Sequence, residues 1–313
     1  MTRIDRRRGL YLTLVTVLMW GLLPVALKHV LTVMDAWTLT WFRFFAAALI
    51  LGVWLAVFGN WSQFRNSVSQ KRHVCALLGL SGLALVSNYV LYLIGLDHIS
   101  PATAQLVIQL GPLLLAVSAT VVFRERFSIK QFLGISLLSA GFALFFHDRF
   151  EILLTSGSAL SSGVLLIVAA AVTWVIYALA QRGIQEHIGT LEVLFCICAF
   201  GSVVLLPWAN PSSVDALNSA SMWALFVFCC LNTIAAYGTF AESLKYWEAS
   251  RASAVLALTP VVTMVTMSAV GTFLPGVMQE ERVDVLILTG SGLVVCGSML
   301  AALGRAGKLS ARS

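Results

Sequence analysis

Residues 20–28 read WGLLPVALK, and residues 174–182 read WVIYALAQR; in each stretch a Trp is followed eight positions later by a cation. Further along the chain, from Tyr89 onward, matches recur at a constant offset of 148 residues, which becomes 156 after an insertion of eight residues. The matched pairs include Tyr89 and Tyr237, Pro112 and Pro260, Gly134 and Gly290, and Gly141 and Gly297. Ordered matches of Trp, Tyr and Pro are hard to obtain by chance, so we predict two copies of one structural unit.

The composition places these copies in a membrane. Of the 313 residues, 59% are apolar and 11% are charged, whereas a soluble domain carries about 25% charged residues. A helix needs about 20 apolar residues to cross the hydrocarbon core. Ten runs are continuously apolar, which predicts helices rather than strands. They are residues 10–31, 36–58, 73–95, 102–123, 131–147, 162–182, 190–209, 221–244, 252–273 and 284–303.

Ten spans make two units of five, residues 1–150 and 151–313. Because five is odd, the second unit enters the membrane from the opposite face, and the two units are inverted. Trp20 and Trp174 are then expected to face one another across a pseudo-two-fold axis in the membrane plane. The predicted fold class is therefore an all-α membrane protein, with ten transmembrane helices arranged as two inverted five-helix repeats that support alternating access.

The positions of Lys and Arg predict the orientation. With a cytoplasmic N-terminus, 16 of the 20 cations fall in cytoplasmic segments and three, Lys28, Arg149 and Arg282, fall outside. Such a bias places both termini in the cytoplasm of the inner (plasma) membrane. The net charge of +6 is then a topology signal and does not indicate nucleic-acid binding.

The two halves also share longer stretches. Residues 96–141 read LDHISPATAQLVIQLGPLLLAVSATVVFRERFSIKQFLGISLLSAG, the second half contains LKYWEASRASAVLALTPVVTMV and EERVDVLILTGSGLVVCG, and residues 41–51 read WFRFFAAALIL. These stretches resemble the drug/metabolite transporter superfamily of the EamA type, over almost the whole chain. The resemblance implies ten helices, cytoplasmic termini and transport of small metabolites, commonly export. The second copy departs from the pattern at Ala249, which matches Pro101, and at the insertion around FLPGVMQE.

Aromatic and neutral polar side chains within the spans are the candidate substrate contacts. Trp and Tyr normally gather at the membrane interface, so deeper ones need a polar partner, and a partly wet cavity supplies one. Gln105 and Gln109 are spaced to project from one face of a helix. Hydrogen bonding between helices is the alternative role. The predicted substrate-binding residues are Trp20, Asn88, Tyr89, Tyr92, Gln105, Gln109, Trp174, Tyr177, Asn232 and Tyr237.

Two prolines occupy matched positions inside the fourth and ninth spans. A proline there removes a helix hydrogen bond and frees backbone carbonyls for neighbours, water or substrate. Pro112 and Pro260 are therefore predicted hinges, with a passive kink as the alternative.

Two charged residues within the spans have candidate roles. Arg43 is well inside a span, where a cation costs about 2.5–3.5 kcal/mol and needs a partner such as a substrate carboxylate or a backbone carbonyl. The resemblance places an Arg here in members with unlike substrates, which favours a structural role. Glu242 is the candidate for proton or cation coupling, against a plain interfacial residue, because no carboxylate lies at the predicted midplane.

Enzymatic motifs are missing from the sequence. It contains no GxxxxGK[ST], HExxH or GxSxG motif, and its six cysteines form no CxxC pair, so we predict no enzyme activity, cofactor or metal site. The predicted function is a secondary transporter that exports or exchanges small polar or amphiphilic metabolites, such as amino acids, through a central cavity. A lipid-linked substrate flippase and a non-transporting receptor or assembly factor are the alternatives. The expected partners are the substrate and the bilayer, and the protein is expected to be a monomer or weak homodimer.

Overall fold

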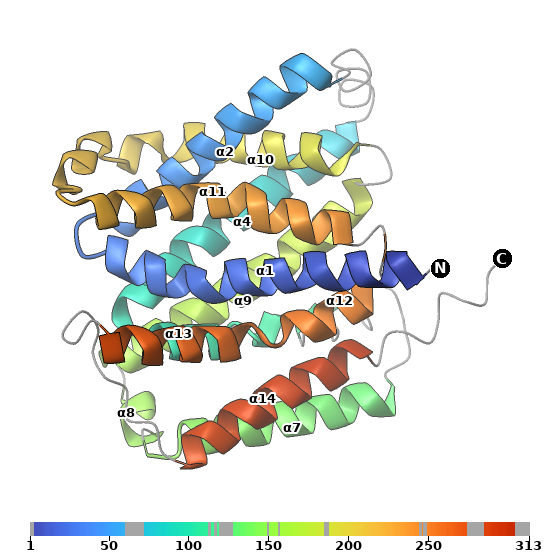
Figure 1. The fold of residues 1–313 in the computed structure, drawn as a ribbon, viewed down its shortest axis with the longest axis vertical. Coiled ribbons are helices and arrows are strands. Elements are labelled where there is room, and N and C mark those ends of the chain that lie inside the picture. The colour runs from blue at the N-terminus through green and yellow to red at the C-terminus, as the bar shows by residue number, and fades with distance from the viewer. Residues whose placement is uncertain are drawn as a thin grey trace. The chain divides into compact units, whose positions relative to one another are not determined.

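The computed structural model describes residues 3–59, 72–111, 114–115, 118, 128–148, 150–155, 157–184, 188–243, 246, 249–273 and 285–303. All regular secondary structure in these ranges is helical (Figure 1). The α-helices are α1 (Arg3–Val30), α2 (Ala36–Phe58), α4 (Arg72–His98), α5 (Pro101–Val107), α7 (Ile129–Phe145), α8 (Phe150–Leu154), α9 (Ala159–Ile184), α10 (Thr190–Leu205), α11 (Ala220–Ser243), α12 (Ala249–Leu256), α13 (Thr259–Phe273) and α14 (Val285–Leu303). Two short 3₁₀ helices, η1 (Leu206–Trp208) and η2 (Pro211–Ala216), follow α10.

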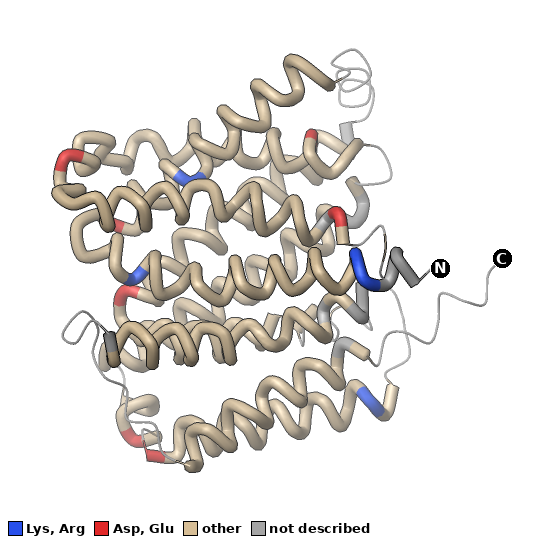
Figure 2. Tube along the Cα trace, viewed as in Figure 1, with Lys and Arg blue, Asp and Glu red and all other residues tan. Residues whose placement is uncertain are grey.

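The described helices have the length and composition of membrane spans. Seven segments are long and apolar enough to cross a bilayer, and α7 and α14 are apolar but shorter. Described Lys, Arg, Asp and Glu residues lie mainly near helix ends (Figure 2). On α2, Leu49, Val53 and Val57 recur every four residues and are each more than half exposed, which is the apolar stripe that lipid requires. The prediction of a multi-pass helical membrane protein is thus confirmed, whereas ten inverted spans stay a prediction.

Two apolar helices, α2 and α7, begin at capping residues that the sequence supplies. Asp35 accepts hydrogen bonds on Oδ1 from the backbone N–H groups of Trp37 and Thr38, at 2.9 and 3.0 Å, and so starts α2. Ser128 and Gln131 cap the first turn of α7 reciprocally. Each cap satisfies amides that have no partner within the helix.

The fourth and ninth predicted spans are each interrupted within the described residues. The ninth is two helices, because α12 ends at Leu256 and α13 begins at Thr259, with Pro260 as its second residue. Proline is tolerated there because the first amides of a helix have no intrahelical acceptor. The fourth span is interrupted at the matching place, since α5 ends at Val107 and is followed by a turn.

Contacts within the chain define two compact units. Unit 1 comprises residues 1–25, 95–168 and 235–313, and unit 2 comprises residues 26–94 and 169–234. Both units therefore draw segments from each of the two predicted halves.

In unit 1, α7 and α14 pack side by side over their length (Figure 1). A Cβ added to Gly134 would lie 2.7 Å from the carbonyl oxygen of Gly297, and one added to Gly141 would lie 2.7 Å from that of Gly290. Because these neighbours are backbone atoms, only glycine permits the approach.

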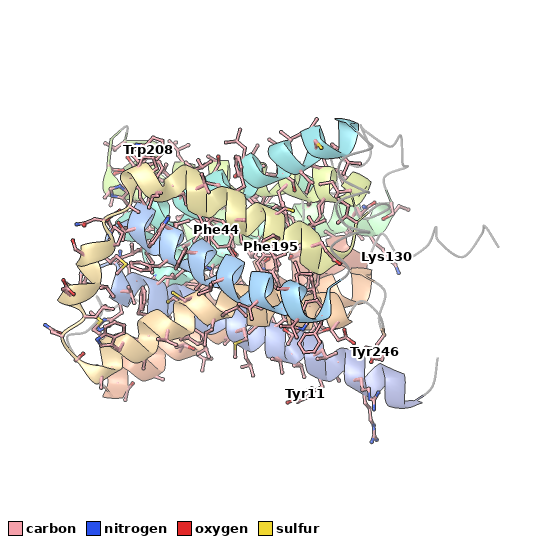
Figure 3. All side chains as sticks on the ribbon, turned by 90° about the horizontal axis from the view of Figure 1, so that it is seen from above. Tyr11, Phe44, Lys130, Phe195, Trp208 and Tyr246 are labelled. Carbon is pink, nitrogen blue, oxygen red and sulfur yellow. The ribbon has the colours of Figure 1, made fainter. Side chains whose placement is uncertain are left out.

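In unit 2, α2 and α10 pack antiparallel through large side chains seated on glycines. Phe44 lies against Gly201, and Phe195 lies against Gly52 (the two phenylalanines are labelled in Figure 3). Trp41 donates a hydrogen bond from Nε1 to the carbonyl oxygen of Ser202 at 2.9 Å. This bond satisfies the indole N–H inside the membrane, so the helix pair has a fixed register.

Candidate functional site

An aromatic cluster in unit 1 contains two of the predicted substrate-binding residues. The ring of Trp20 contacts that of Tyr237 edge-on, with centroids 5.4 Å apart, and that of Phe240 at 5.8 Å. One turn before Trp20, the hydroxyl groups of Thr16 and Thr239 are hydrogen-bonded at 2.9 Å. Trp20 and Tyr237 are both half-buried. The cluster joins α1 to the last turns of α11 and keeps the indole ring partly accessible.

The two interrupted helices of unit 1 meet through Gln109. Its side chain is 8% exposed, and Nε2 donates to the carbonyl oxygen of Ala257 at 3.1 Å. Ala257 lies in the turn between α12 and α13, where carbonyls lose their helical partners. Gln109 itself lies beyond the end of α5, whereas Gln105 is buried within α5. The amide of Gln109 thus donates to a carbonyl at the break between α12 and α13.

A second bond ties the interrupted region to α1. The hydroxyl group of Thr263 donates to the carbonyl oxygen of Gly21 at 2.7 Å, and a Cβ on Gly21 would lie 2.5 Å from Val262. Gly21 adjoins Trp20, so α13 is bonded to α1 directly beside the aromatic cluster of Trp20, Tyr237 and Phe240. The sequence did not single out Thr263 or Thr16, because a threonine in a helix ordinarily bonds to its own backbone and carries no other signal.

Unit 2 contains most of the other predicted residues. Tyr89 of α4 is 6% exposed, and its ring lies under the guanidinium of Arg43, with Cζ 4.4 Å from the ring centroid. Phe44 packs on the same ring at 4.8 Å. Asn88 donates from Nδ2 to the carbonyl oxygen of Ala170 at 2.7 Å. For Asn88 the structure thus shows the interhelical hydrogen bond that was the alternative to a substrate contact.

The remaining predicted residues are placed as follows. Tyr177 and Asn232 are buried in unit 2, where Trp174 and Tyr92 are half-buried. In unit 1, Glu242 is half-buried in the last turn of α11. Pro260 is buried at the start of α13, and Pro112 lies outside the described residues. The described part of the chain contains no group of three or more His, Cys, Asp or Glu side chains that could hold a metal ion.

A chain of apolar spanning helices with buried polar groups and interrupted segments has the construction of a multi-pass membrane transporter. The sequence profile of the EamA-like transporter family matches residues 7–147 and 161–303, and the chain belongs to this family. The resemblance to the drug/metabolite transporter superfamily is therefore confirmed. The protein is a membrane transporter.

Curated relatives match along nearly the whole chain. An uncharacterized transporter of Haemophilus influenzae is 32% identical over 296 residues, covering 95% of each chain. The uncharacterized inner membrane transporter YhbE of Escherichia coli K12 is 31% identical and covers 95% of this chain and 91% of its own. A solved crystal structure, 19% identical, superposes with a TM-score of 0.64 over 96% of this chain and 99% of the other. At that identity, the likeness shows the fold alone.

Proposed function

We propose that the protein exports or exchanges small polar or amphiphilic metabolites, in particular amino acids, across the inner membrane by alternating access. In this proposal, residues 1–150 and 151–313 are inverted five-helix repeats with both termini in the cytoplasm. The protein works as a monomer or weak homodimer and hydrolyses no nucleotide.

The hydrogen bond between Gln109 and Ala257 is the observation that carries the proposal. The two residues are 148 positions apart, which is the repeat offset found in the sequence, so Gln109 bonds to its own counterpart. When two copies are related by a two-fold axis, a residue touches its counterpart only near that axis. Helix breaks at such an axis free carbonyls where repeat-built transporters bind their substrates.

The glycine contacts of α7 and α14 support the same symmetry. In the repeat, Gly134 matches Gly290 and Gly141 matches Gly297. In the structure the contacts are exchanged, because Gly134 lies against Gly297 and Gly141 lies against Gly290. Such reciprocal contact is the pattern of a two-fold axis between antiparallel helices. The two separate matches of the family profile, at 7–147 and 161–303, also support a repeat of this length.

The side chains in both units favour an amphiphilic substrate. The half-buried rings of Trp20 and Tyr237 present apolar faces with polar edges, and Gln105 and Gln109 add neutral donors and acceptors. In unit 2, the half-buried rings of Tyr92 and Trp174 supply the same aromatic chemistry. A substrate with an apolar side chain and a polar end uses both kinds of contact.

Counterflow in proteoliposomes tests the proposal. Vesicles containing the purified protein are loaded with unlabelled Thr, Met, Phe or Trp and given the same amino acid in radiolabelled form outside. We expect at least one label to accumulate several-fold faster than in vesicles without protein. Rates equal to those of empty vesicles for all four would overturn the amino-acid proposal. Translocation of a fluorescent lipid instead would favour the flippase alternative.

A further inference from the structure

Arg43 is a buried cation on a membrane helix. It is the eighth residue of α2, is 3% exposed, and lies about 10 Å along the axis from the first residue of the helix. It is the one Lys or Arg within α2. A charge at that depth is costly unless an anion or several hydrogen-bond acceptors accompany it.

The contacts of Arg43 stabilise its charge without balancing it. The face of the Tyr89 ring, 4.4 Å from Cζ, attracts the guanidinium through the ring quadrupole, but a ring face carries no net charge. Nε of Arg43 is buried and has no hydrogen-bond partner among the described residues. Four groups on three other helices lie within electrostatic reach, namely Tyr92, Cys198, Cys229 and Cys230. Phenols and thiols are ordinarily neutral at pH 7.

The described carboxylates of unit 2 are too far away to pair with Arg43. Asp35 precedes it by eight residues, or about 12 Å along the axis, and is engaged in capping α2. Glu192 lies toward the opposite end of α10, roughly 15 Å from the level of Arg43, because α10 runs antiparallel to α2 with Gly201 beside Phe44. Asp215 is exposed in η2, and Glu186 lies outside the described residues.

Thr233 of α11 is a second buried polar residue, and it lies on the same face of that helix as Cys229, a neighbour of Arg43. Thr233 follows Cys229 by four residues, so both project from one face of the helix. Thr233 is 1% exposed, and its Oγ1 has no hydrogen-bond partner among the described residues. In contrast, Thr40 on α2 donates from Oγ1 to the carbonyl oxygen of Ala36 at 2.7 Å. The hydroxyl group of Thr233 is thus available to a ligand.

We propose that Arg43 and Thr233 bind the carboxylate of the transported metabolite, an assignment that rests on the transport function proposed above. One carboxylate balances one guanidinium and accepts hydrogen bonds from both side chains. Because Arg43 is 3% exposed here, the carboxylate reaches it in another conformation of the carrier. The sequence favoured a structural role for Arg43, and the distance of the described carboxylates of unit 2 favours the substrate role instead.

Matched pairs of ligands test the assignment on the full-length protein. In phenylalaninamide and methioninamide, a neutral carboxamide replaces the carboxylate of phenylalanine and methionine while the side chain is unchanged. Each is used to compete with radiolabelled amino-acid counterflow in proteoliposomes. We expect the acid to compete at a concentration at least tenfold lower than its amide. Equal competition by acid and amide would leave the transporter intact and overturn the carboxylate assignment, whereas flux of no amino acid would overturn the proposed function and the assignment with it.

Two variants locate the effect. Arg43→Gln should bring the acid and the amide to within about twofold of each other, and Arg43→Lys should restore part of the difference because it keeps the charge. Thr233→Val should weaken competition by the acid several-fold. Thr40→Val is the matched control, since its hydroxyl group already bonds within α2. If Arg43→Gln does not fold, Thr233→Val still tests the shared site. An unchanged preference for the acid in Thr233→Val would overturn it, and so would an equal loss of acid competition in the control Thr40→Val.

Discussion

Gly134 of α7 and Gly297 of α14 lie so close that a Cβ on Gly134 would come within 2.7 Å of the carbonyl oxygen of Gly297. The same separation holds between Gly141 and the carbonyl oxygen of Gly290. Lipid tails are as apolar as leucine, so helices in a bilayer associate through close packing rather than through the hydrophobic effect. The glycines therefore set how tightly these two helices pack.

Substitutions on α14 test this close packing. A Cβ on Gly290 would meet the backbone nitrogen of Phe145 at 2.6 Å, whereas one on Gly292 would meet nothing within 4 Å. We expect Gly290→Ala to destabilise the protein by about 1–3 kcal/mol, as overpacking does. Gly292→Ala, on the same helix, should be neutral or stabilising by up to about 1 kcal/mol. Thermal unfolding in detergent measures both, and equal midpoints would contradict the close contact.

Trp20 is expected to contribute to transport through its ring. Trp20→Ala removes the contacts with Tyr237 and Phe240, so we expect counterflow to fall at least tenfold, whereas Trp20→Phe should retain part of the rate. The control is Trp54→Ala, because Trp54 lies on α2 and is 42% exposed. Full activity in Trp20→Ala would exclude the ring from the transport path and favour a non-transporting role.

Pro260 tests the interruption of the ninth span. Pro260→Ala restores a backbone N–H and lowers the cost of a continuous helix from α12 to α13. We expect slower counterflow with a change in unfolding temperature of only a few degrees. Pro211→Ala, in the exposed first position of η2, serves as the matched proline control. A wild-type rate in Pro260→Ala would show that the break is a passive kink.

Asp35 tests the start of α2. Asp35→Ala removes the acceptor for the amides of Trp37 and Thr38, which should cost about 1 kcal/mol of stability. Asp35→Asn keeps a capping oxygen and should lose much less. The unfolding midpoints of the two variants in detergent measure the difference, and identical values would show that the cap contributes nothing.

The same capping residues show how far local sequence predicts this fold. The second span, predicted at 36–58, coincides with α2 because a long apolar run follows a capping aspartate, and both signals are local. The fourth and ninth spans were each predicted as one segment with a proline hinge, and the structure interrupts the helices a few positions before those prolines. A proline disfavours a helix interior, but whether the chain bends or breaks there depends on neighbours such as Gln109 that satisfy the freed carbonyls.

Apolar length and composition by themselves determined that this chain is a helical membrane protein, because a bilayer forces every span to satisfy its own backbone. The resemblance of its longer stretches to drug/metabolite transporters indicated the class of transporter, and the family match confirmed it. The apolar runs also placed Arg43 inside a span and Trp20 near the middle of one. Only the tertiary structure decided that Tyr89 lies under Arg43, that Asn88 is engaged with Ala170, and that Gln109 bonds to Ala257. Those contacts join residues that are distant in the sequence. The pattern of residues along the chain does not predict them, because it does not determine which helix faces pack against each other.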